Sequence, residues 1–423
     1  MGPRLPTTMH NGAAWSRRFA GTTPGVIVAV VVVSVVLCLL AGFTGANQLG
    51  GKVSRHEQVL EHTEPLAFAA QRLYVALSAA DAAAAEAFLS GGIETPAVRA
   101  RYQQALADAA AALAEATAGA SDARTRSIVA RISAELPSFT GLVETARANN
   151  RQGFPVGSAY LREASALMQD SLLKNAQDLS TTRSAAVRDD QRRIAAMPVT
   201  TIGLLLLVLL ACGGGSYLLL RRTNRRINLG LVAAAGATAL ALVWIVASTA
   251  FAAAAMDNDD SGASKEFQTL AEARILAQQA RTDETLQLIT RGDIAAGEES
   301  YSAHVAQLRE RVVTVLGTGS PADTSLTEWT EGHRVQVEAY RAANYNAALA
   351  QAIGAGPESS ASRFALVDKT LGADLTRTRN ELRGGVNDAG DALSWSPAVT
   401  LLLMLGAAAA IVVGLWPRLK EFL

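Results

Sequence analysis

Four long apolar stretches divide the chain into alternating short and long segments. They cover residues 24–43, 199–220, 227–255 and 397–415, and none contains a charged side chain. A helix needs about 20 apolar residues to cross the hydrocarbon core of a bilayer. The pattern therefore predicts four transmembrane helices, separated by residues 1–23, 44–198, 221–226, 256–396 and 416–423.

The first long segment, residues 44–198, has the punctuation of four helices. Its breaks fall at Gly91–Gly92 before Pro96, at Gly119 before Ser121, a candidate N-cap, and between Asn149 and Gly157. The helices between them are long, short, short and long, and we expect the outer two to run unbroken into the membrane spans. Apolar residues step by threes and fours along the first helix, at Leu66, Ala70, Leu73, Leu77, Ala80, Ala84 and Ala87. This rhythm predicts an antiparallel four-helix bundle.

The second long segment, residues 256–396, repeats this plan. Breaks fall at residues 291–293, at Gly317 to Pro321 and at Gly354 to Pro357. The last helix carries apolar residues at helical spacing, at Phe364, Val367, Leu371, Leu375, Leu382, Val386, Ala389 and Leu393. Residue-level identity between the two segments is weak, so the repeat is one of topology. The predicted fold is an all-α polytopic membrane protein with two extracytoplasmic antiparallel four-helix bundles.

Basic residues predict the orientation of the spans. They lie before the first span, in the link between the second and third, and after the fourth, at Arg4, Arg17, Arg18, Arg221, Arg222, Arg225, Arg226, Arg418 and Lys420. Positive loops stay in the cytoplasm, so both termini are expected inside and both long segments outside. Asp257, Asp259 and Asp260 follow the third span, whereas Arg188, Arg192 and Arg193 oppose the rule before the second. A cleaved signal peptide is the alternative for the first span, but its apolar run is long for a signal core.

Little in the sequence indicates catalysis or metal binding. Cys38 and Cys212 both lie in predicted spans, so no disulfide is expected in the long segments. His56 and His62 are off the spacing that shares a helix face, and His304 and His333 stand alone. The Asp257–Asp260 run lacks the glycine and distal glutamate of a calcium-binding hand. We expect no enzyme activity, no cofactor and no metal, and the equal numbers of acidic and basic residues (38 each) argue against a nucleic-acid partner.

The residues from Asn150 to Leu161, followed by Ala164 and Ser165, resemble the start of the last helix in chemoreceptor-type four-helix-bundle ligand-binding domains. With two such segments and four spans, the whole chain resembles the actinobacterial GlnX family of membrane proteins. The resemblance implies a relay of amino-acid status from an extracytoplasmic solute-binding lipoprotein to a cytoplasmic Ser/Thr protein kinase.

The segments expected inside are too short for a kinase, a cyclase or a methylation helix, so we expect any output to pass to a partner. The candidate relay surface consists of Arg221, Arg222, Arg225, Arg226, Trp416, Arg418 and Lys420. The alternative for this arginine cluster is topology control and contact with membrane lipid headgroups, and the two are compatible.

Outside, two kinds of binding residue are candidates. Arg72, Tyr74 and Arg274 could hold a ligand carboxylate, although an arginine on a helix face is commonly just solvated. The loops far from the spans are better suited to docking a partner protein. The docking candidates are Asn149, Asn150, Arg151, Phe154, Gly354 and Glu358, with the loops at Gly91 to Pro96 and residues 291–297. The alternatives to the relay are a static envelope scaffold, which could form a homodimer, and a direct small-molecule chemosensor.

Overall fold

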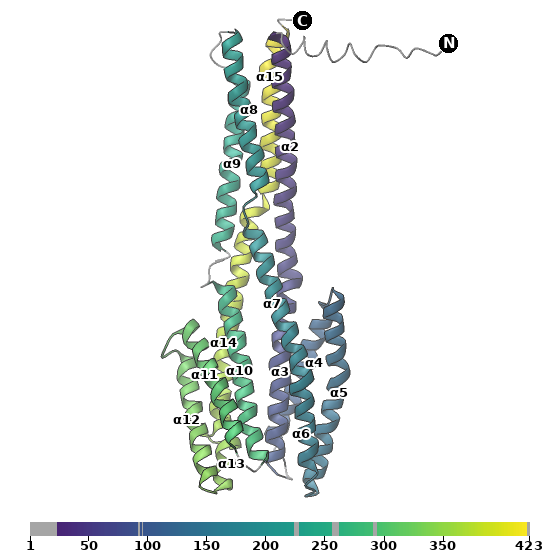
Figure 1. Cartoon of the computed structure of the whole chain (residues 1–423), viewed down its shortest axis with the longest axis vertical. Coiled ribbons are helices and arrows are strands. Elements are labelled where there is room, and N and C mark those ends of the chain that lie inside the picture. Colours follow the sequence, from purple (N-terminus) through teal and green to yellow (C-terminus); the bar gives the residue numbers. More distant parts are fainter. Residues whose placement is uncertain are drawn as a thin grey trace, which may run out of the picture. The chain divides into compact units, whose positions relative to one another are not determined.

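The computed structural model describes residues 23–91, 94, 96–223, 228–255, 262–290 and 294–420, and every regular element in these ranges is a helix. The chain forms two compact units (Figure 1). Residues 1–57, 191–256 and 385–423 make up one, here called the membrane unit. Residues 58–190 and 257–384 make up the other, here called the polar unit.

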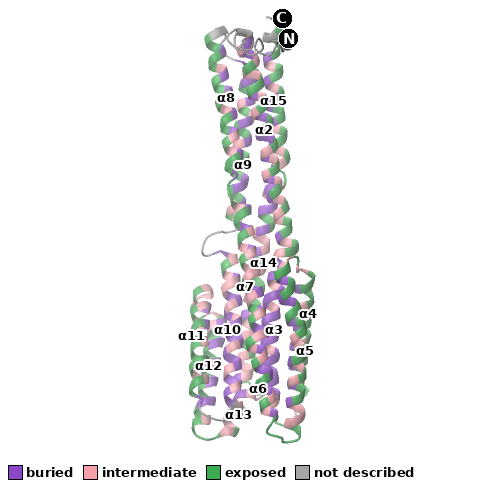
Figure 2. Ribbon diagram, turned by 45° about the vertical axis from the view of Figure 1, so that its right-hand side comes forward, coloured by how far each residue is buried: buried purple, intermediate pink, exposed green. Residues whose placement is uncertain are grey.

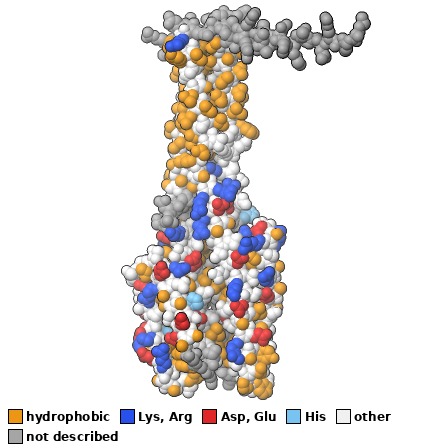
Figure 3. Space-filling model, in the orientation of Figure 1, with side chains coloured by type: hydrophobic (Ala, Val, Ile, Leu, Met, Phe, Trp, Pro, Cys, Tyr) orange, Lys and Arg blue, Asp and Glu red, His pale blue; other side chains and the backbone are white. Residues whose placement is uncertain are grey.

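The membrane unit contains the four predicted spans. They lie in α2 (Thr23–Gln58), α8 (Val199–Thr223), α9 (Leu229–Ala255) and α15 (Ser396–Lys420), and each is long and apolar enough to cross a bilayer. Large apolar side chains point outward from these helices; Leu210 and Val413, for example, are each 71% exposed. Figure 3 shows the resulting hydrophobic surface. Such a surface is stable in lipid and not in water, so the predicted all-α membrane fold is confirmed.

Small residues bring α9 and α15 close together. A Cβ on Gly230 would collide with the carbonyl oxygen of Ala410 and with the backbone of Gly414. A Cβ on Gly42 of α2 would lie 2.8 Å from that of Met404 on α15. Helices in lipid associate largely through this close packing of small residues.

Within the described residues, two predicted helix–span junctions are interrupted, and at one of them the single residue Trp395 separates α14 (Ser360–Ser394) from α15. α7 (Leu173–Ala195) ends before Pro198, and α8 begins at Val199, so the expectation of an unbroken helix is wrong there. Proline lacks an N–H and disfavours the helical conformation in the residue before it. The Lys52 ammonium instead donates to the carbonyl oxygens of Ile194 (2.9 Å) and Ala196. By contrast, α2, the π-helical turn η1 (Val59–Thr63) and α3 (Glu64–Leu89) follow one another without interruption.

The first half of the polar unit follows the predicted breaks. It comprises α3, α4 (Pro96–Ala118), α5 (Ala123–Arg151), α6 (Gly157–Leu167), the π-helical turn η2 (Met168–Leu172) and most of α7. All seven heptad positions predicted for the first helix are buried, which confirms the predicted packing face. The N-cap of α5 is Asp122 and not Ser121. The backbone of Asp122 is extended, and its carboxylate accepts a hydrogen bond from Thr125 N at 2.9 Å.

The second half contains one break more than the sequence pattern indicates. Its helices are α10 (Ala263–Thr290), α11 (Ala295–Leu316), α12 (Pro321–Arg341), α13 (Tyr345–Ile353) and α14 (Ser360–Ser394). The helix expected over 321–353 is split between α12 and α13. Ala343 has a φ of 59°, and Asn344 caps α13 by accepting a hydrogen bond from Ala347 N at 3.1 Å. Asparagine favours the N-cap position of a helix, so Asn344 was the residue that could have indicated this break in the sequence.

Both halves contribute to one hydrophobic core. The cluster of buried residues on α3, α4, α5 and the α6–α7 helix also includes Ile275 of α10. Figure 2 shows buried positions running along both α3 and α10. The two helices therefore pack against each other within the polar unit.

Candidate functional site at the seam between the two halves

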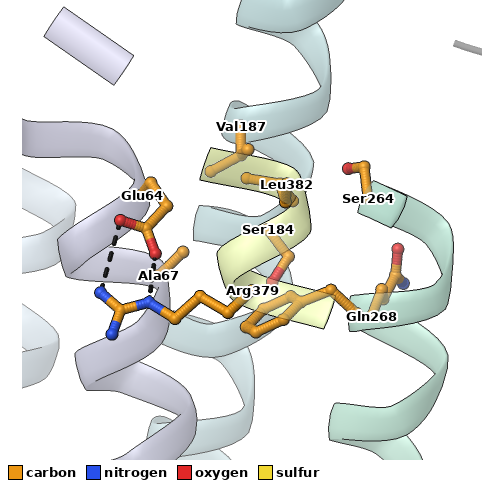
Figure 4. Close-up of a pocket in the computed structure, with 9 residues that line it drawn as sticks. Glu64, Ala67, Ser184, Val187, Ser264, Gln268, Arg379 and Leu382 are labelled. Carbon is orange, nitrogen blue, oxygen red and sulfur yellow. Dashed lines mark hydrogen bonds and ion pairs between the residues drawn. The ribbon is translucent and has the colours of Figure 1, made fainter. Parts of the chain in front are cut away.

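A charged cluster joins the two halves of the polar unit where η1 meets α3. The Glu64 side chain is only 6% exposed and faces two arginines of α14. Arg379 Nε donates to Glu64 Oε1 at 2.6 Å (Figure 4). Arg383 donates to Glu64 Oε2 at 2.5 Å. Hydrogen bonds between ionised groups are stronger than neutral ones. We call Glu64, Arg379 and Arg383 the latch.

The latch is a contact between helices and not a ligand pocket, because its surroundings leave little free space. The Arg379 guanidinium lies 3.7 Å from the centre of the Phe68 ring, a cation–π contact within the same seam. The adjacent cavity has a volume of about 20 Å³, enough for about one water molecule. Immediately before Glu64, η1 departs from α-helical geometry, and π-helical turns are frequent at functional sites.

Further along the seam the contacts become aromatic and neutral. The rings of Phe68 on α3 and Phe267 on α10 lie 6.4 Å apart. Gln279 Nε2 donates to the hydroxyl of Tyr74 at 2.9 Å, and Tyr74 is 1% exposed. Burial raises the pKa of Tyr74 to about 12, so its hydroxyl is protonated at neutral pH. The predicted ligand residue Tyr74 is thus part of the contact between the halves.

A larger cleft opens along α7, α10 and α11. Its volume is about 400 Å³, within the range of small-molecule sites. Most of the residues that line it are polar or charged. The lining consists of Gln177, Ser180, Thr181, Ser184, Gln268, Ala271, Glu272, Ile275, Leu276, Gln279, His304, Gln307 and Arg311. None of these residues was singled out as a ligand candidate from the sequence, because polar residues spaced along separate helices resemble ordinary solvated faces.

The two arginines expected to bind a ligand carboxylate both have partners inside the protein. Arg72 forms an ion pair with Glu115 of α4 at 3.1 Å. Arg274 binds both carboxylate oxygens of Asp368 on α14, at 2.8 and 3.0 Å. Arg274 therefore ties α10 to α14 in this structure.

The predicted docking residues of the first half lie at the α5–α6 turn. Asn149 and Asn150 donate to the carbonyl oxygens of Thr145 and Phe88, at 2.9 Å each. Phe154 is 53% exposed, and Arg151 borders a polar cavity of about 240 Å³. An exposed aromatic ring beside an arginine is a common composition for a protein-binding surface.

In the second half, Gly354 caps α13, and the Glu358 carboxylate pairs with Arg363. Glu358 is nonetheless 80% exposed at its side chain, so it remains accessible to a partner.

Part of the predicted relay surface lies within the described residues. The Arg221 guanidinium is 5.0 Å from the centre of the Tyr217 ring, Trp416 is 56% exposed, and Lys420 is exposed. Arg225 and Arg226 lie outside the described residues, as do the side chains of Arg222 and Arg418. The N-terminal arginines and the Asp257–Asp260 run also lie outside them.

A buried charged network in the second half was missed from the sequence. His333 on α12 contacts Glu284 on α10 at 3.2 Å and Glu298 on α11 at 3.0 Å. Arg281 donates to Glu284 at 2.6 Å, and the ring of Tyr301 stacks on His333 with centres 3.6 Å apart. His333 is therefore not the isolated residue that the sequence indicated, since its partners come from other helices.

Residues 55–192 match the sequence model of the actinobacterial sensor domain. The matched region includes η1, Glu64 and the whole first half of the polar unit. No curated protein and no solved structure matches the chain. Together with the four apolar helices, the match identifies a sensor-type membrane protein and supports a role in signalling.

Proposed function

We propose that the chain is a transmembrane relay without catalytic activity of its own. In this proposal, an extracytoplasmic solute-binding lipoprotein delivers amino-acid status to the polar unit, and a cytoplasmic Ser/Thr protein kinase receives the signal. The actinobacterial sensor-domain match and the resemblance to the GlnX family support it. The short segments expected inside the cell, with Trp416 and the arginine link, would supply the kinase contact, and the same arginines would meet anionic lipid headgroups.

The latch is the observation that most directly supports a relay. Glu64 belongs to the uninterrupted helical stretch Gly25–Leu89, whereas Arg379 and Arg383 belong to the stretch Ser360–Pro417. Each stretch contains a candidate membrane span. A shift of one helix against the other by an ångström or two would break these ion pairs or exchange their partners, which gives two discrete arrangements. A signal must bind those arrangements unequally in order to change their populations.

The Glu64→Gln variant tests the relay in cells. Loss of the carboxylate charge leaves Arg379 and Arg383 unpaired and frees α3 from α14. We expect the phosphorylation response of Ser/Thr kinase substrates to amino-acid depletion to be lost, as in a strain that lacks the gene. Glu331→Gln, which removes an exposed ion pair with Arg334 on α12, is the matched control and should respond normally. A normal response in both the Glu64→Gln variant and the deletion strain would refute the relay.

The proposed docking of the solute-binding lipoprotein has a separate test. The exposed Arg151 has no ion-pair partner among the described residues, so Arg151→Glu reverses a charge at the α5–α6 turn without breaking a contact. We expect this change, combined with Glu358→Arg, to weaken association of the full-length protein with the binding lipoprotein. Unchanged association in the double variant would place the docking surface elsewhere.

A further inference from the structure

We infer that the cleft along α7, α10 and α11 binds a small uncharged solute that carries several hydroxyl or amide groups. Binding to the cleft does not depend on the proposed sensory function; only the use of that binding as a signal rests on it. The volume of about 400 Å³ suits a molecule of about monosaccharide size.

The two charged side chains that line the cleft, Arg311 and Glu272, already neutralise each other. Arg311 donates to Glu272 at 3.1 Å, and both side chains face the cleft. His304 contacts the carboxylate of Asp283 at 2.7 Å. A charged ligand that bound Arg311 or Glu272 would have to separate this ion pair, and the separation leaves a partly buried charge without its partner. The electrostatics of the cleft therefore favour a neutral ligand.

The groups that remain available for hydrogen bonding are themselves neutral. Within the described residues, the side chains of Gln177 on α7 and Gln307 on α11 have no hydrogen-bond partner. The hydroxyls of Ser180 and Ser184 on α7 also have none in that part of the chain. Amides and hydroxyls both donate and accept hydrogen bonds, so they complement a ligand with the same kinds of group.

Apolar side chains provide the remaining surface. Ala271, Ile275 and Leu276 of α10 line the cleft beside the polar groups. They can contact the carbon skeleton of a ligand while the amides and hydroxyls fix its orientation. Since α7 belongs to the first half and α10 and α11 to the second, a ligand bound here would hold the two halves together.

Binding can be measured with the full-length protein in nanodiscs by saturation-transfer NMR. The probes are glucose, N-acetylglucosamine and succinamide, which are neutral, with glucuronate and glucosamine as charged analogues of similar size. We expect at least one neutral probe to bind at millimolar concentration or below, and its charged analogue to bind at least about tenfold more weakly, because of the separated ion pair. Preference for the sugars or for the diamide identifies which neutral groups the cleft recognises.

Variants locate the binding. Gln307→Trp, at an exposed position, should block the cleft and abolish binding, and the Gln177→Ala/Gln307→Ala double variant should weaken it about tenfold through two lost hydrogen bonds. Gln103→Ala, an exposed glutamine on α4, is the matched control and should change nothing. Absence of binding by every neutral probe, equal binding of charged analogues, or full binding by Gln307→Trp would overturn the inference. These measurements report binding alone, so their failure is distinguishable from a failure of the kinase response.

Discussion

Glu284 and His333 form a charged pair in the interior of the second half, with side chains 0% and 6% exposed. Burial alone would lower the pKa of His333, but the hydrogen bonds and charges of Glu284 and Glu298 outweigh it and raise the pKa to about 9. Burial would raise the pKa of Glu284, but Arg281, His333 and Ser360 outweigh it and lower the pKa to about 2. Both groups are therefore charged at neutral pH, and removing one partner of such a pair is costly.

The Glu284–His333 pair predicts that the protein loses stability at both acidic and alkaline pH. Because the folded pKa of His333 is raised, its contribution is complete below its ordinary pKa of 6.5 and is lost as pH rises through about 9. The contribution of Glu284 is complete above 4.5 and is lost as pH falls toward about 2. We expect His333→Gln to destabilise the protein by about 3 kcal/mol at neutral pH and to remove the alkaline loss. Thermal unfolding across pH measures both effects, and an unchanged alkaline profile in the variant would contradict the assignment.

A second buried carboxylate differs from Glu284 because its charged form is unfavourable in the folded protein. Asp81 on α3 is 2% exposed and accepts hydrogen bonds from Ser165 (3.0 Å) and Gln169 (2.9 Å), but no cation pairs with it among the described residues. Burial raises its pKa to about 6, against the smaller opposing effect of these hydrogen bonds. Ionisation of Asp81 is thus unfavourable in the folded protein.

Replacement of Asp81 should stabilise the protein. The contribution of Asp81 to stability should fall as pH rises from 3.8 to about 6 and then stay constant. Asp81→Asn keeps an acceptor for Ser165 and Gln169 without the charge, so we expect a gain of about 2 kcal/mol at neutral pH. The unfolding temperatures of the two proteins should converge in acid. A less stable Asp81→Asn protein at neutral pH would show that the charged carboxylate has a favourable partner.

At the scale of elements, the junction between α7 and α8 depends on one lysine and one proline. Pro198 interrupts the helix, and Lys52 of α2, 8% exposed, satisfies two of the carbonyl oxygens at the end of α7. A cation at a helix C-terminus also interacts favourably with the helix dipole. This contact therefore connects α2 with the end of α7 inside the membrane unit.

Lys52→Met keeps the length of the side chain and removes the donor. We expect a destabilisation of about 2 kcal/mol, because buried carbonyl oxygens lose their partner, and faster hydrogen exchange at residues 196 and 197. Pro198→Ala lets α7 and α8 form regular helical hydrogen bonds across the break, so it should reduce the effect of Lys52→Met. Additive effects of the two changes would mean that lysine and proline act independently.

At the scale of the whole molecule, the two long segments of the sequence form one polar unit. Ile275 of α10 is 8% exposed and belongs to a core whose other buried residues come from the first half. The Tyr74–Gln279 hydrogen bond and the latch lie in the same seam. A substitution that destabilises one half should therefore also destabilise the other half.

A charge buried in this seam tests the coupling. We expect Ile275→Asp to destabilise the protein by about 3 kcal/mol, since an unpaired carboxylate enters an apolar core, and to expose α4 and α5 to proteolysis. Val335→Asp, at a 41% exposed position on α12, is the matched control and should have little effect. Proteolysis confined to the second half in Ile275→Asp would mean that the halves unfold independently.

The sequence alone determined the features that depend on local chemistry and length. Uncharged runs such as 199–220 are long enough to span a bilayer, and glycine and proline at Gly91, Pro96 and Gly317 end or begin helices wherever the chain folds. The spacing of Leu66, Leu73 and Leu77 marked a face that the structure buries. Of the candidate site, the sequence indicated the exposed Arg151 and Phe154 at the α5–α6 turn and drew attention to Tyr74.

Only the tertiary structure decided which of these faces meet. Glu64 and Arg379 are 315 residues apart, and nothing in the sequence near either residue indicates the other. His333 lies among partners from α10 and α11, and the cleft exists only because α7 of one half lies beside α10 and α11 of the other. Helical periodicity identifies an apolar face but not the face it packs against, because many pairings bury a similar apolar area. Buried charges and shared cavities depend on that pairing, and therefore the latch, the network and the cleft had to come from the structure.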